Sequence, residues 1–374
     1  MSLEAESLIH INLPEISEEE IEAVVNVMRR GPLTNALGAG PAVSKFEENY
    51  AKFAGVKHAV AVNSGTAALH SAIVAVGVKP GDEVILPSFT FVATAEAVVM
   101  AGGKPVFTDI DPETYNISPV EIERNVTKQT KVIVPVDLYG FSADVKPIKE
   151  IAVGHDLAVV EDAAQAHGAT YAGKPAGVFS DAACWSLYAS KNITTGEGGV
   201  VTTGSDEVTE TLRLIRTHGE KAKYASLMLG HNYRMSEIQA AIGLVQLKRL
   251  PSFLAKRRKN AQRLTEILTK SARLQLPKET KDRLHSWYLY TVRLKDGYES
   301  ERAKILDKLK KKRIGAAAYY VHPVHTMPYY RESFGEPELP ETEKAARQVL
   351  SLPIHPGVTE AQVDFIGKTL LDLL

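Results

Sequence analysis

The chain has 374 residues, of which 44% are hydrophobic and 24% are charged. Its 44 lysines and arginines almost balance its 45 aspartates and glutamates, so the formal net charge is only -1. This balance argues against a bulk electrostatic partner such as a nucleic acid or an anionic membrane. The single cysteine, Cys184, excludes an internal disulfide and a cysteine-rich zinc site, and it fits a reducing cytoplasm.

The first residues, "MSLEAESLIH", carry acidic side chains where a signal peptide would need a basic flank and an apolar run. No apolar stretch of the sequence approaches the ~18 residues that a membrane span requires. We therefore expect a cytoplasmic protein without a membrane partner.

From about residue 57 to residue 203, short apolar runs alternate with helical patterns. The runs are "HAVAV", "EVILP", "KPVFTDI", "KVIVPVDL" and "LAVVED". Continuous apolar strands separated by helices are typical of a mostly parallel sheet with helices on both faces. The sequence thus predicts an N-terminal arm and a large α/β domain in residues 1–250.

The pattern changes after residue 250. The stretches "AKRRKNAQRLTEILTK" and "ERAKILDKLKKKR" have the spacing of amphipathic helices, and they enclose an alternating strand, "SWYLYTVRL". This predicts a smaller α+β domain in residues 251–374. The basic cluster "KLKKKR" is interpreted as the solvated face of a helix rather than a nucleic-acid site.

Open α/β sheets bind ligands at the carboxyl ends of their strands, so the residues that follow each strand are of first interest. Asn63, Ser64, Gly65 and Thr66 follow "HAVAV" and open a helix, where N–H groups and hydroxyls favour an anion. An ordinary helix cap is the alternative. Neither a G-x-x-x-x-G-K-[ST] loop nor a G-x-G-x-x-G turn is present, so a small phosphate monoester fits better than a nucleotide.

Two more strand ends carry polar side chains. Asp162, with Gln165 after it, follows "LAVVE"; the carboxylate either serves a site or caps a helix. Lys191 lies between the strands expected at 183–188 and 199–203, among small and hydroxyl residues, and the nearest following carboxylate is Glu197. An isolated loop lysine is usually solvated, but small neighbours leave room for a bulky group.

A phosphate cradle, a carboxylate and a lysine together indicate pyridoxal phosphate (PLP). This cofactor needs an anion site, an amine for its aldehyde, and a carboxylate beside its pyridine nitrogen. An aromatic ring against the cofactor would complete the set. Phe89 and Phe91 follow a strand end, and each either faces the cofactor or belongs to the core.

Five stretches in this order closely resemble the DegT/DnrJ/StrS family of sugar aminotransferases, within fold type I PLP-dependent enzymes. They are "NSGTAAL", "GDEVILPSFTFVATAEAV", "VEDAAQAHGA", "SLYASKNITTGEGGVV" and "HNYRMSEIQAAIGLVQL". The resemblance extends from "FEENYAKFAGV" to "HPVHTMPYY". It implies the fold of that family: a large domain with a mostly parallel sheet sandwiched by helices, and a smaller α+β domain.

The resemblance also implies roles for single residues. Lys191 would bind PLP covalently, Asp162 would pair with the pyridine nitrogen, and Gln165 would lie near the 3-hydroxyl. Three residues would hold the phosphate, namely Gly65, Thr66 and Ser186. Phe91 would stack on the ring, and Asn232 would reach the phosphate of a neighbouring subunit, which makes a homodimer with shared sites the expected assembly.

Substrate contacts are expected at the C-terminal part of the resemblance. Tyr319, His322 and His325 lie where the family lines its cleft, although an i, i+3 histidine pair can also be structural or a weak metal site; we expect no metal. Lys221, Lys223 and Tyr224 either contact a diphosphate or face water. One departure from the family is the longer loop "GPLTNALGAGPAV", which has extra residues between Thr34 and Pro41.

The leading hypothesis is an aminotransferase that moves an amino group from an amino acid, with glutamate expected, to a keto group of a nucleotide-linked deoxysugar. Related dehydratases carry histidine in place of the lysine, so Lys191 favours transamination. The alternative is a regulatory or binding protein that uses the fold without turnover. The nucleotide, the sugar and the choice between carbon 3 and carbon 4 are left open.

Overall fold

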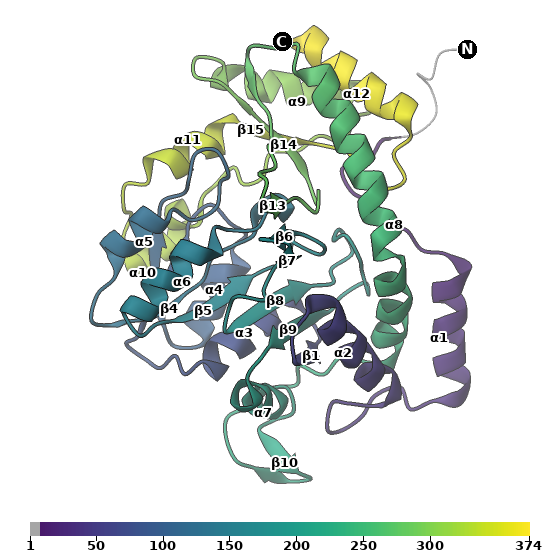
Figure 1. Cartoon of the computed structure of the whole chain (residues 1–374), viewed down its shortest axis with the longest axis vertical. Helices are drawn as coiled ribbons and strands as arrows, with labels where there is room; N and C mark the ends of the chain where they lie inside the picture. Colours follow the sequence, from purple (N-terminus) through teal and green to yellow (C-terminus); the bar gives the residue numbers. More distant parts are fainter. Residues whose placement is uncertain (1–7) are drawn as a thin grey trace.

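A computed structural model describes residues 8–374 of the chain. The first seven residues of the expected N-terminal arm, and most of the stretch examined for a signal peptide, lie outside this range. A large α/β part contains a seven-stranded sheet, and a smaller part contains a three-stranded sheet. One long helix, α8 (Glu237–Leu268), runs beside both parts (Figure 1).

The large sheet has the strand order β1-β9-β8-β5-β4-β2-β3. Strand β9 is antiparallel to β1 and β8, and the other neighbours are parallel. The strands are β1 (His58–Val62), β2 (Glu83–Pro87), β3 (Lys104–Thr108), β4 (Thr130–Ile133), β5 (Ala158–Asp162), β8 (Ala182–Ser186) and β9 (Gly199–Thr203). Every apolar run expected to form a strand does so, which confirms the mostly parallel sheet.

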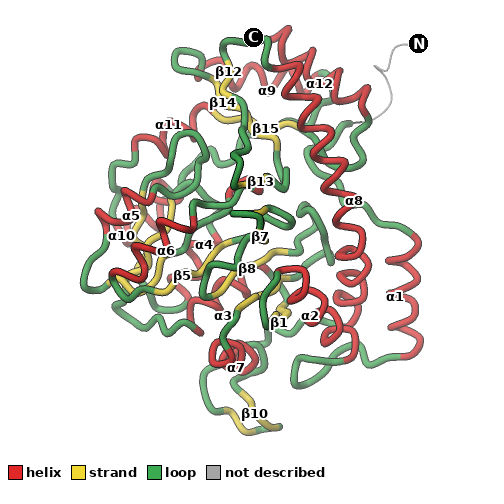
Figure 2. The backbone as a smooth tube through the Cα atoms, in the orientation of Figure 1, coloured by secondary structure: helices red, strands yellow, loops and turns green. Residues whose placement is uncertain are grey.

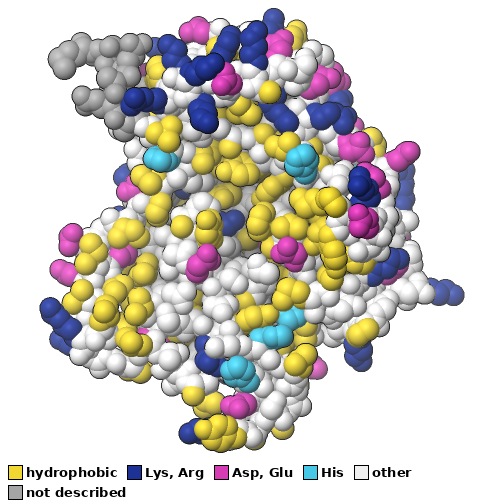
Figure 3. Space-filling view, turned by 180° about the vertical axis from the view of Figure 1, so that it is seen from behind, with side chains coloured by type: hydrophobic (Ala, Val, Ile, Leu, Met, Phe, Trp, Pro, Cys, Tyr) yellow, Lys and Arg dark blue, Asp and Glu magenta, His cyan; other side chains and the backbone are white. Residues whose placement is uncertain are grey.

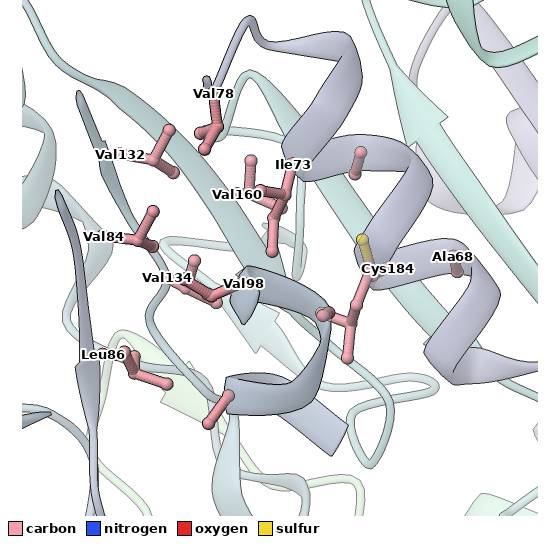
Figure 4. Close-up of a cluster of buried hydrophobic side chains, with 14 of the residues drawn as sticks. Ala68, Ile73, Val78, Val84, Leu86, Val98, Val132, Val134, Val160 and Cys184 are labelled. Atoms are coloured by element: carbon pink, nitrogen blue, oxygen red, sulfur yellow. The ribbon is translucent and has the colours of Figure 1, made fainter. Parts of the chain in front are cut away.

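Helices cover both faces of this sheet, as the tube in Figure 2 also shows. One face lies under α3 (Gly65–Ala75), α4 (Ala93–Met100) and α7 (Asp206–Ile215), and the other under α2 (Pro41–Ala54), α5 (Pro119–Asn125) and α6 (Val145–Gly154). Figure 4 shows the first of these cores, in which Ile73 of α3 and Val98 of α4 meet Val160 and Cys184 of the sheet. The cysteine is a buried, free thiol.

The small part has an antiparallel sheet in which β14 (Tyr290–Leu294) lies between β12 (Leu274–Gln275) and β15 (Val349–Leu352). Its core is closed by α8, α9 (Arg302–Lys311) and α12 (Glu360–Leu373). On α9, Ile305 and Leu309 are buried while Lys308 and Lys310 are exposed, so the basic cluster is the solvated face of a helix.

The remaining elements are short or peripheral. They are α1 (Glu18–Arg30), β6 (Thr170–Tyr171), β7 (Lys174–Pro175), β10 (Glu220–Ala222), β11 (Ala225–Ser226), β13 (Arg283–Leu284), α10 (Pro328–Phe334) and α11 (Pro340–Gln348). Within residues 8–374, no helix combines the length and the apolar character that crossing a membrane requires.

The expected boundary at residue 250 falls inside α8. The stretch that was predicted to begin a new helix after residue 250 continues the same helix through Pro251. In addition, Tyr330 and Leu339 from the C-terminal third belong to the core of the large sheet. The division into residues 1–250 and 251–374 stays a prediction.

Candidate active site

Lys191 lies in a tight turn after β8. Its backbone N–H donates to the carbonyl of Tyr188 at 2.9 Å. The backbone N–H of Thr195 donates to the carbonyl of Leu187 at 3.0 Å. The buried amide of Asn192 donates to the carbonyls of His167, at 3.3 Å, and Ser286, at 3.0 Å. The small and hydroxyl residues thus form a turn fixed on both sides, and this turn presents one half-buried lysine side chain.

Asp162 ends β5, the neighbour of β8 in the sheet. The Thr94 hydroxyl donates to one carboxylate oxygen at 2.8 Å, and the Ala164 N–H donates to the other at 3.2 Å. Burial raises the pKa of this carboxyl group, while the two hydrogen bonds and the positive charge of Lys191 lower it. The structure therefore brings the predicted lysine and carboxylate within electrostatic reach of each other.

Gln165 follows Asp162 and is almost fully buried. Its side-chain oxygen accepts the Tyr139 N–H at 2.7 Å, and its side-chain nitrogen donates to the Tyr320 hydroxyl at 3.0 Å. The amide thereby links the end of β5 to two tyrosines, one of them in the segment where substrate contacts are expected.

The predicted phosphate residues meet at the N-terminus of α3. The Ser64 hydroxyl accepts the N–H of Ala67 at 3.0 Å, so this serine is a helix cap as well. The N–H groups of Gly65 and Thr66, in the first turn, have no acceptor inside the helix. A Cβ atom at Gly65 would lie 2.8 Å from the Cβ atom of Ser186, so only glycine allows the two segments to approach this closely.

The two candidate aromatic residues differ in their surroundings. Phe89 is fully buried and makes an edge contact with Tyr139, so it belongs to the core. Phe91 is 57% exposed, and its ring centroid lies 6.3 Å from that of Tyr320. Of the two, Phe91 presents a ring that is free to cover a ligand.

Asn232 has an exposed side chain, and its backbone carbonyl accepts a hydrogen bond from the Asn63 amide at 3.1 Å. This contact places residue 232 beside the turn that precedes α3. The hairpin formed by β10 and β11 precedes it, with Tyr224, Leu227 and Leu229 largely exposed.

The three predicted substrate residues lie in different surroundings. Tyr319 is half-buried, and its carbonyl accepts the Tyr139 hydroxyl. His322 is exposed, whereas His325 is fully buried with its Nδ1 atom 2.6 Å from the Ser88 hydroxyl. The two histidines therefore do not share one environment. Within the described residues, no group of three or more His, Cys, Asp or Glu side chains could hold a metal ion.

The long loop before α2 is tied to α8. The carboxylate of Glu237 accepts a hydrogen bond from the Ala42 N–H at 2.6 Å. The backbone N–H of Glu237 donates to the carbonyl of Leu33 at 3.0 Å. Gly38 has a positive φ of 79° and approaches the side chain of Arg216, so the extra residues close against the large part. Lys221, Lys223 and Tyr224 are exposed.

Sequence reasoning missed Tyr288, which comes from the segment before β14. The Lys191 ammonium nitrogen lies 4.7 Å from the centre of its ring, and its hydroxyl lies 3.0 Å from that of Ser190. The run "SWYLY" indicated a strand and gave no sign that one of its aromatic side chains reaches the lysine.

Comparison with known proteins identifies the family. The family model of the DegT/DnrJ/EryC1/StrS aminotransferase family matches residues 14–371. The chain is 40% identical over 366 residues to the pleiotropic regulatory protein of Geobacillus stearothermophilus, covering 97% of both chains. It is also 40% identical over 369 residues to GDP-perosamine synthase of Caulobacter vibrioides, covering 98% of both.

Solved structures agree with this assignment. The PLP-form of Spr1654 from Streptococcus pneumoniae superposes with a TM-score of 0.92 at 29% identity, over 98% of both chains. This similarity confirms the expected fold type I architecture. Because the family model spans almost the whole sequence and two relatives share 40% of their residues with it, the chain belongs to the DegT/DnrJ/EryC1/StrS aminotransferase family.

Proposed function

We propose that this protein transfers an amino group from an amino acid to the keto group of a nucleotide-linked sugar, using PLP bound to Lys191. The observation that carries the proposal is that Lys191 lies within electrostatic reach of Asp162 after neighbouring strands, next to the cradle of Gly65, Thr66 and Ser186. A binding protein would have no need of a buried carboxylate that its surroundings make costly to ionise.

The residues present fit PLP. Gly65 and Ser186 form a close-approach cradle at a helix N-terminus, where N–H groups favour a phosphate. Asp162 is buried and offers a carboxylate to a pyridine nitrogen, and Phe91 offers an uncovered ring for stacking. Lys191 would hold the cofactor through its ε-amine, and Gln165 lies one turn from Asp162 with its amide directed at Tyr139 and Tyr320.

When bound, PLP supplies an electron sink that stabilises negative charge on the carbon next to the amine. The remaining chemistry belongs to the chain. Asp162, whose pKa is raised by burial and whose charged form is favoured by Thr94, Ala164 and Lys191, would keep the pyridine nitrogen protonated. Once Lys191 is released by the amino donor, its ε-amine would act as general base and acid. It would remove the proton from the amine-bearing carbon of the donor and deliver it to the carbon of the cofactor's aldehyde group.

The substrate class rests on the relatives. One of the two 40% identical proteins is named GDP-perosamine synthase, which supports a nucleotide-linked sugar as acceptor and synthesis of an amino sugar for a polysaccharide or another glycan. The other is named a pleiotropic regulatory protein, so loss of turnover is the alternative that the test must address. Glutamate as donor and a cytoplasmic location stay predictions.

The central test replaces Lys191 with alanine. Lys191→Ala should prevent the formation of a borohydride-reducible adduct with PLP and lower turnover by at least ~10²–10⁴-fold. Lys174→Ala, at an exposed position on β7, is the matched control and should retain both. A reducible adduct that persists in Lys191→Ala would show that another residue holds the cofactor. A wild-type protein that takes up no PLP would support the regulatory alternative.

We further propose that the enzyme is a homodimer with shared active sites. The side chain of Asn232 is exposed, and the neighbouring hairpin places Tyr224, Leu227 and Leu229 at the surface. The space-filling view shows apolar side chains at this lower tip and across the middle of the same face (Figure 3). Contact with a second copy would cover them and bring Asn232 to the partner's phosphate site.

Complementation tests the shared site. Lys191→Ala dimers should be inactive, and Asn232→Ala dimers should retain PLP poorly. A mixed dimer then has one site with both defects and one site with neither, so activity should reappear after co-refolding. If both residues serve the same site, each site of a mixed dimer carries one lesion, and activity stays at the Asn232→Ala background. Native mass spectrometry would establish that mixed dimers form.

The acceptor can be identified directly. The protein would be loaded with pyridoxamine phosphate and mixed with keto sugars linked to GDP, UDP or dTDP, with the keto group at carbon 3 or carbon 4. Return of the aldehyde form of the cofactor, followed by absorbance, marks the accepted sugar. If no nucleotide-linked keto sugar restores the aldehyde form while a free keto acid does, the proposed acceptor class is wrong.

A further inference from the structure

Tyr288 places an aromatic ring beside the proposed reacting amine. The Lys191 ammonium nitrogen lies over the face of its ring, 4.7 Å from the ring centre. Tyr288 is only 9% exposed, so the contact is largely shielded from water. An ammonium over an aromatic face is stabilised by the ring quadrupole, and the effect is larger when water is excluded.

The backbone around Tyr288 is held firmly on both sides. Its carbonyl accepts a hydrogen bond from the buried Arg257 guanidinium at 3.1 Å, and the next N–H, that of Leu289, donates to Tyr139 at 3.2 Å. Before it, the Trp287 N–H donates to the His285 ring at 2.8 Å, and these two rings stack at 4.2 Å. The ring therefore stands on a rigid segment of the small part.

A second link joins the ring to the lysine turn itself. The Tyr288 hydroxyl lies 3.0 Å from the Ser190 hydroxyl, and Ser190 is the residue directly before Lys191. The face of the Tyr288 ring thus contacts the Lys191 ammonium, and the hydroxyl at the edge of the same ring contacts the turn that carries Lys191. One side chain from the small part fixes both the turn and the amine that the turn presents.

Among the described residues, the other groups around Lys191 and Tyr288 offer the lysine no second cation–π contact. Asp162 supplies the opposite charge. His167 is fully buried. Its burial, and to a smaller extent the positive charge of Lys191, lowers its pKa to about 3, so the imidazole is neutral at physiological pH. Tyr319 and Tyr320 have pKa values raised by burial and stay as neutral phenols.

We propose that Tyr288 is a positioning residue for Lys191: its ring face holds the ε-ammonium at the site, and its hydroxyl ties that ring to Ser190. The inference rests on the proposed function, in which Lys191 must leave the cofactor, transfer protons and rejoin it. An untethered lysine would spend part of each cycle in other rotamers, so the ring should raise kcat and leave KM almost unchanged.

Two substitutions separate the parts of the proposal. Tyr288→Leu removes the ring, and kcat should fall about tenfold with KM changed less than about twofold. Tyr288→Phe keeps the ring face, and kcat should stay within about threefold. Ser190→Ala should match Tyr288→Phe, and the double variant should show no further loss, because both changes break the same hydrogen bond.

Labelling of the cofactor-free full chain gives a readout other than activity. A small acylating reagent would be added, and the modification of Lys191 would be followed by mass spectrometry relative to the exposed Lys174. Because the ring covers Lys191, Tyr288→Leu should label Lys191 at least about fivefold faster. Tyr288→Phe should label it at the wild-type rate.

Tyr115→Leu is the packing control. Tyr115 is buried in the same hydrophobic cluster as Tyr288, so its loss creates a comparable cavity. It should lower the melting temperature without the faster labelling of Lys191. If Tyr115→Leu accelerates labelling as much as Tyr288→Leu does, the effect is general loosening and the proposal is wrong.

The outcomes distinguish the two proposals. If Lys191→Ala abolishes adduct and turnover while Tyr288→Leu keeps the wild-type kcat and labelling rate, the proposed function stands and the role of Tyr288 is wrong. If Lys191→Ala retains the adduct, the proposed function itself fails, whatever Tyr288 does.

Discussion

Asp162 is held between opposing influences. Its burial disfavours the charged form, whereas Thr94, the Ala164 N–H and Lys191 favour it. A carboxylate stabilised by groups that are already in place needs no rearrangement when positive charge appears beside it. This makes Asp162 the residue whose charge, rather than its shape, should matter for the reaction.

Asp162→Asn tests that distinction. The amide keeps the size of the side chain but cannot stabilise a protonated pyridine nitrogen, so turnover should fall by about 10²-fold or more. The measurements are kcat in a half-reaction with glutamate and the absorption spectrum of the bound cofactor. Thr94→Val, which removes one hydrogen bond to the carboxylate, should have a much smaller effect. Activity of Asp162→Asn within a few-fold of wild type would reduce Asp162 to a turn-forming residue.

At this scale, the sequence predicts positions best where a residue follows a strand. Gly65, Asp162 and Lys191 could be placed in one region because each follows a strand and its chemistry differs from that of its neighbours, while their roles stay predictions. Tyr288 and Ser190 could not, because their role depends on a contact between the small part and a turn 98 positions earlier in the chain. His325 shows the converse: its position in a motif suggests a substrate contact, but its side chain is buried against Ser88.

At the scale of elements, one buried carboxylate links α1 to α8. Glu20 is 1% exposed and accepts hydrogen bonds from Ser17, Gln246 and Arg249, the last two from α8. Burial raises the pKa of Glu20, but these hydrogen bonds outweigh it and lower the pKa to about 2. The interaction therefore stabilises the folded chain in its ionised form.

Glu20→Gln should lower the free energy of unfolding by about 2–3 kcal/mol at pH 7. Because the folded pKa lies below the usual 4.5, the contribution of Glu20 is present above about pH 4.5 and is lost as the pH falls towards 2. Urea denaturation at pH 7 and pH 3.5 should therefore show a smaller difference at the lower pH. Glu19→Gln, whose carboxylate lies at the surface 3.4 Å from Lys248, is the control and should cost less than about 0.5 kcal/mol. An equal loss for both variants would contradict the prediction.

The elements themselves were largely predictable. The five apolar runs form strands because their side chains are buried by helices on both faces, and that requirement is visible as continuous hydrophobicity. The continuity of α8 was not predictable from local signals, since Pro251 and the change in composition both suggest a break. Burial of both halves of the helix outweighs the cost of one proline.

For the whole molecule, the buried histidines set the response to acid. Burial lowers the pKa of His70 and His355 to about 4, and of His167 and His285 to about 3. In the unfolded chain these groups titrate near ~6.5. Between about pH 6 and pH 4.5 the unfolded state therefore binds more protons, and stability falls as the pH decreases. Asp137 acts in the opposite direction, because burial and then Glu161 raise its pKa.

We expect the free energy of unfolding to fall by about 4 kcal/mol per pH unit near pH 5, because the lowered pKa values of these four histidines and of His325 outweigh the raised pKa values of Asp137 and Asp162. Chemical denaturation at pH 7, 6, 5.5 and 5 would measure it. His285→Asn preserves an acceptor for the Trp287 N–H and should reduce the slope by about a third. A denaturation midpoint that does not change between pH 7 and pH 5 would show that these histidines become protonated without unfolding.

Helix α8 has a consequence for recombination between relatives. At 32 residues it is ~48 Å long, and its side chains complete two cores, with Leu250 and Phe253 in one and Leu264 and Leu268 in the other. A crossover at residue 250 would join half-helices that evolved against different neighbours. A chimaera that exchanges the small part should instead carry its junction after Leu268, so that α8 stays intact and comes from the same parent as α1 and α2, which pack against it.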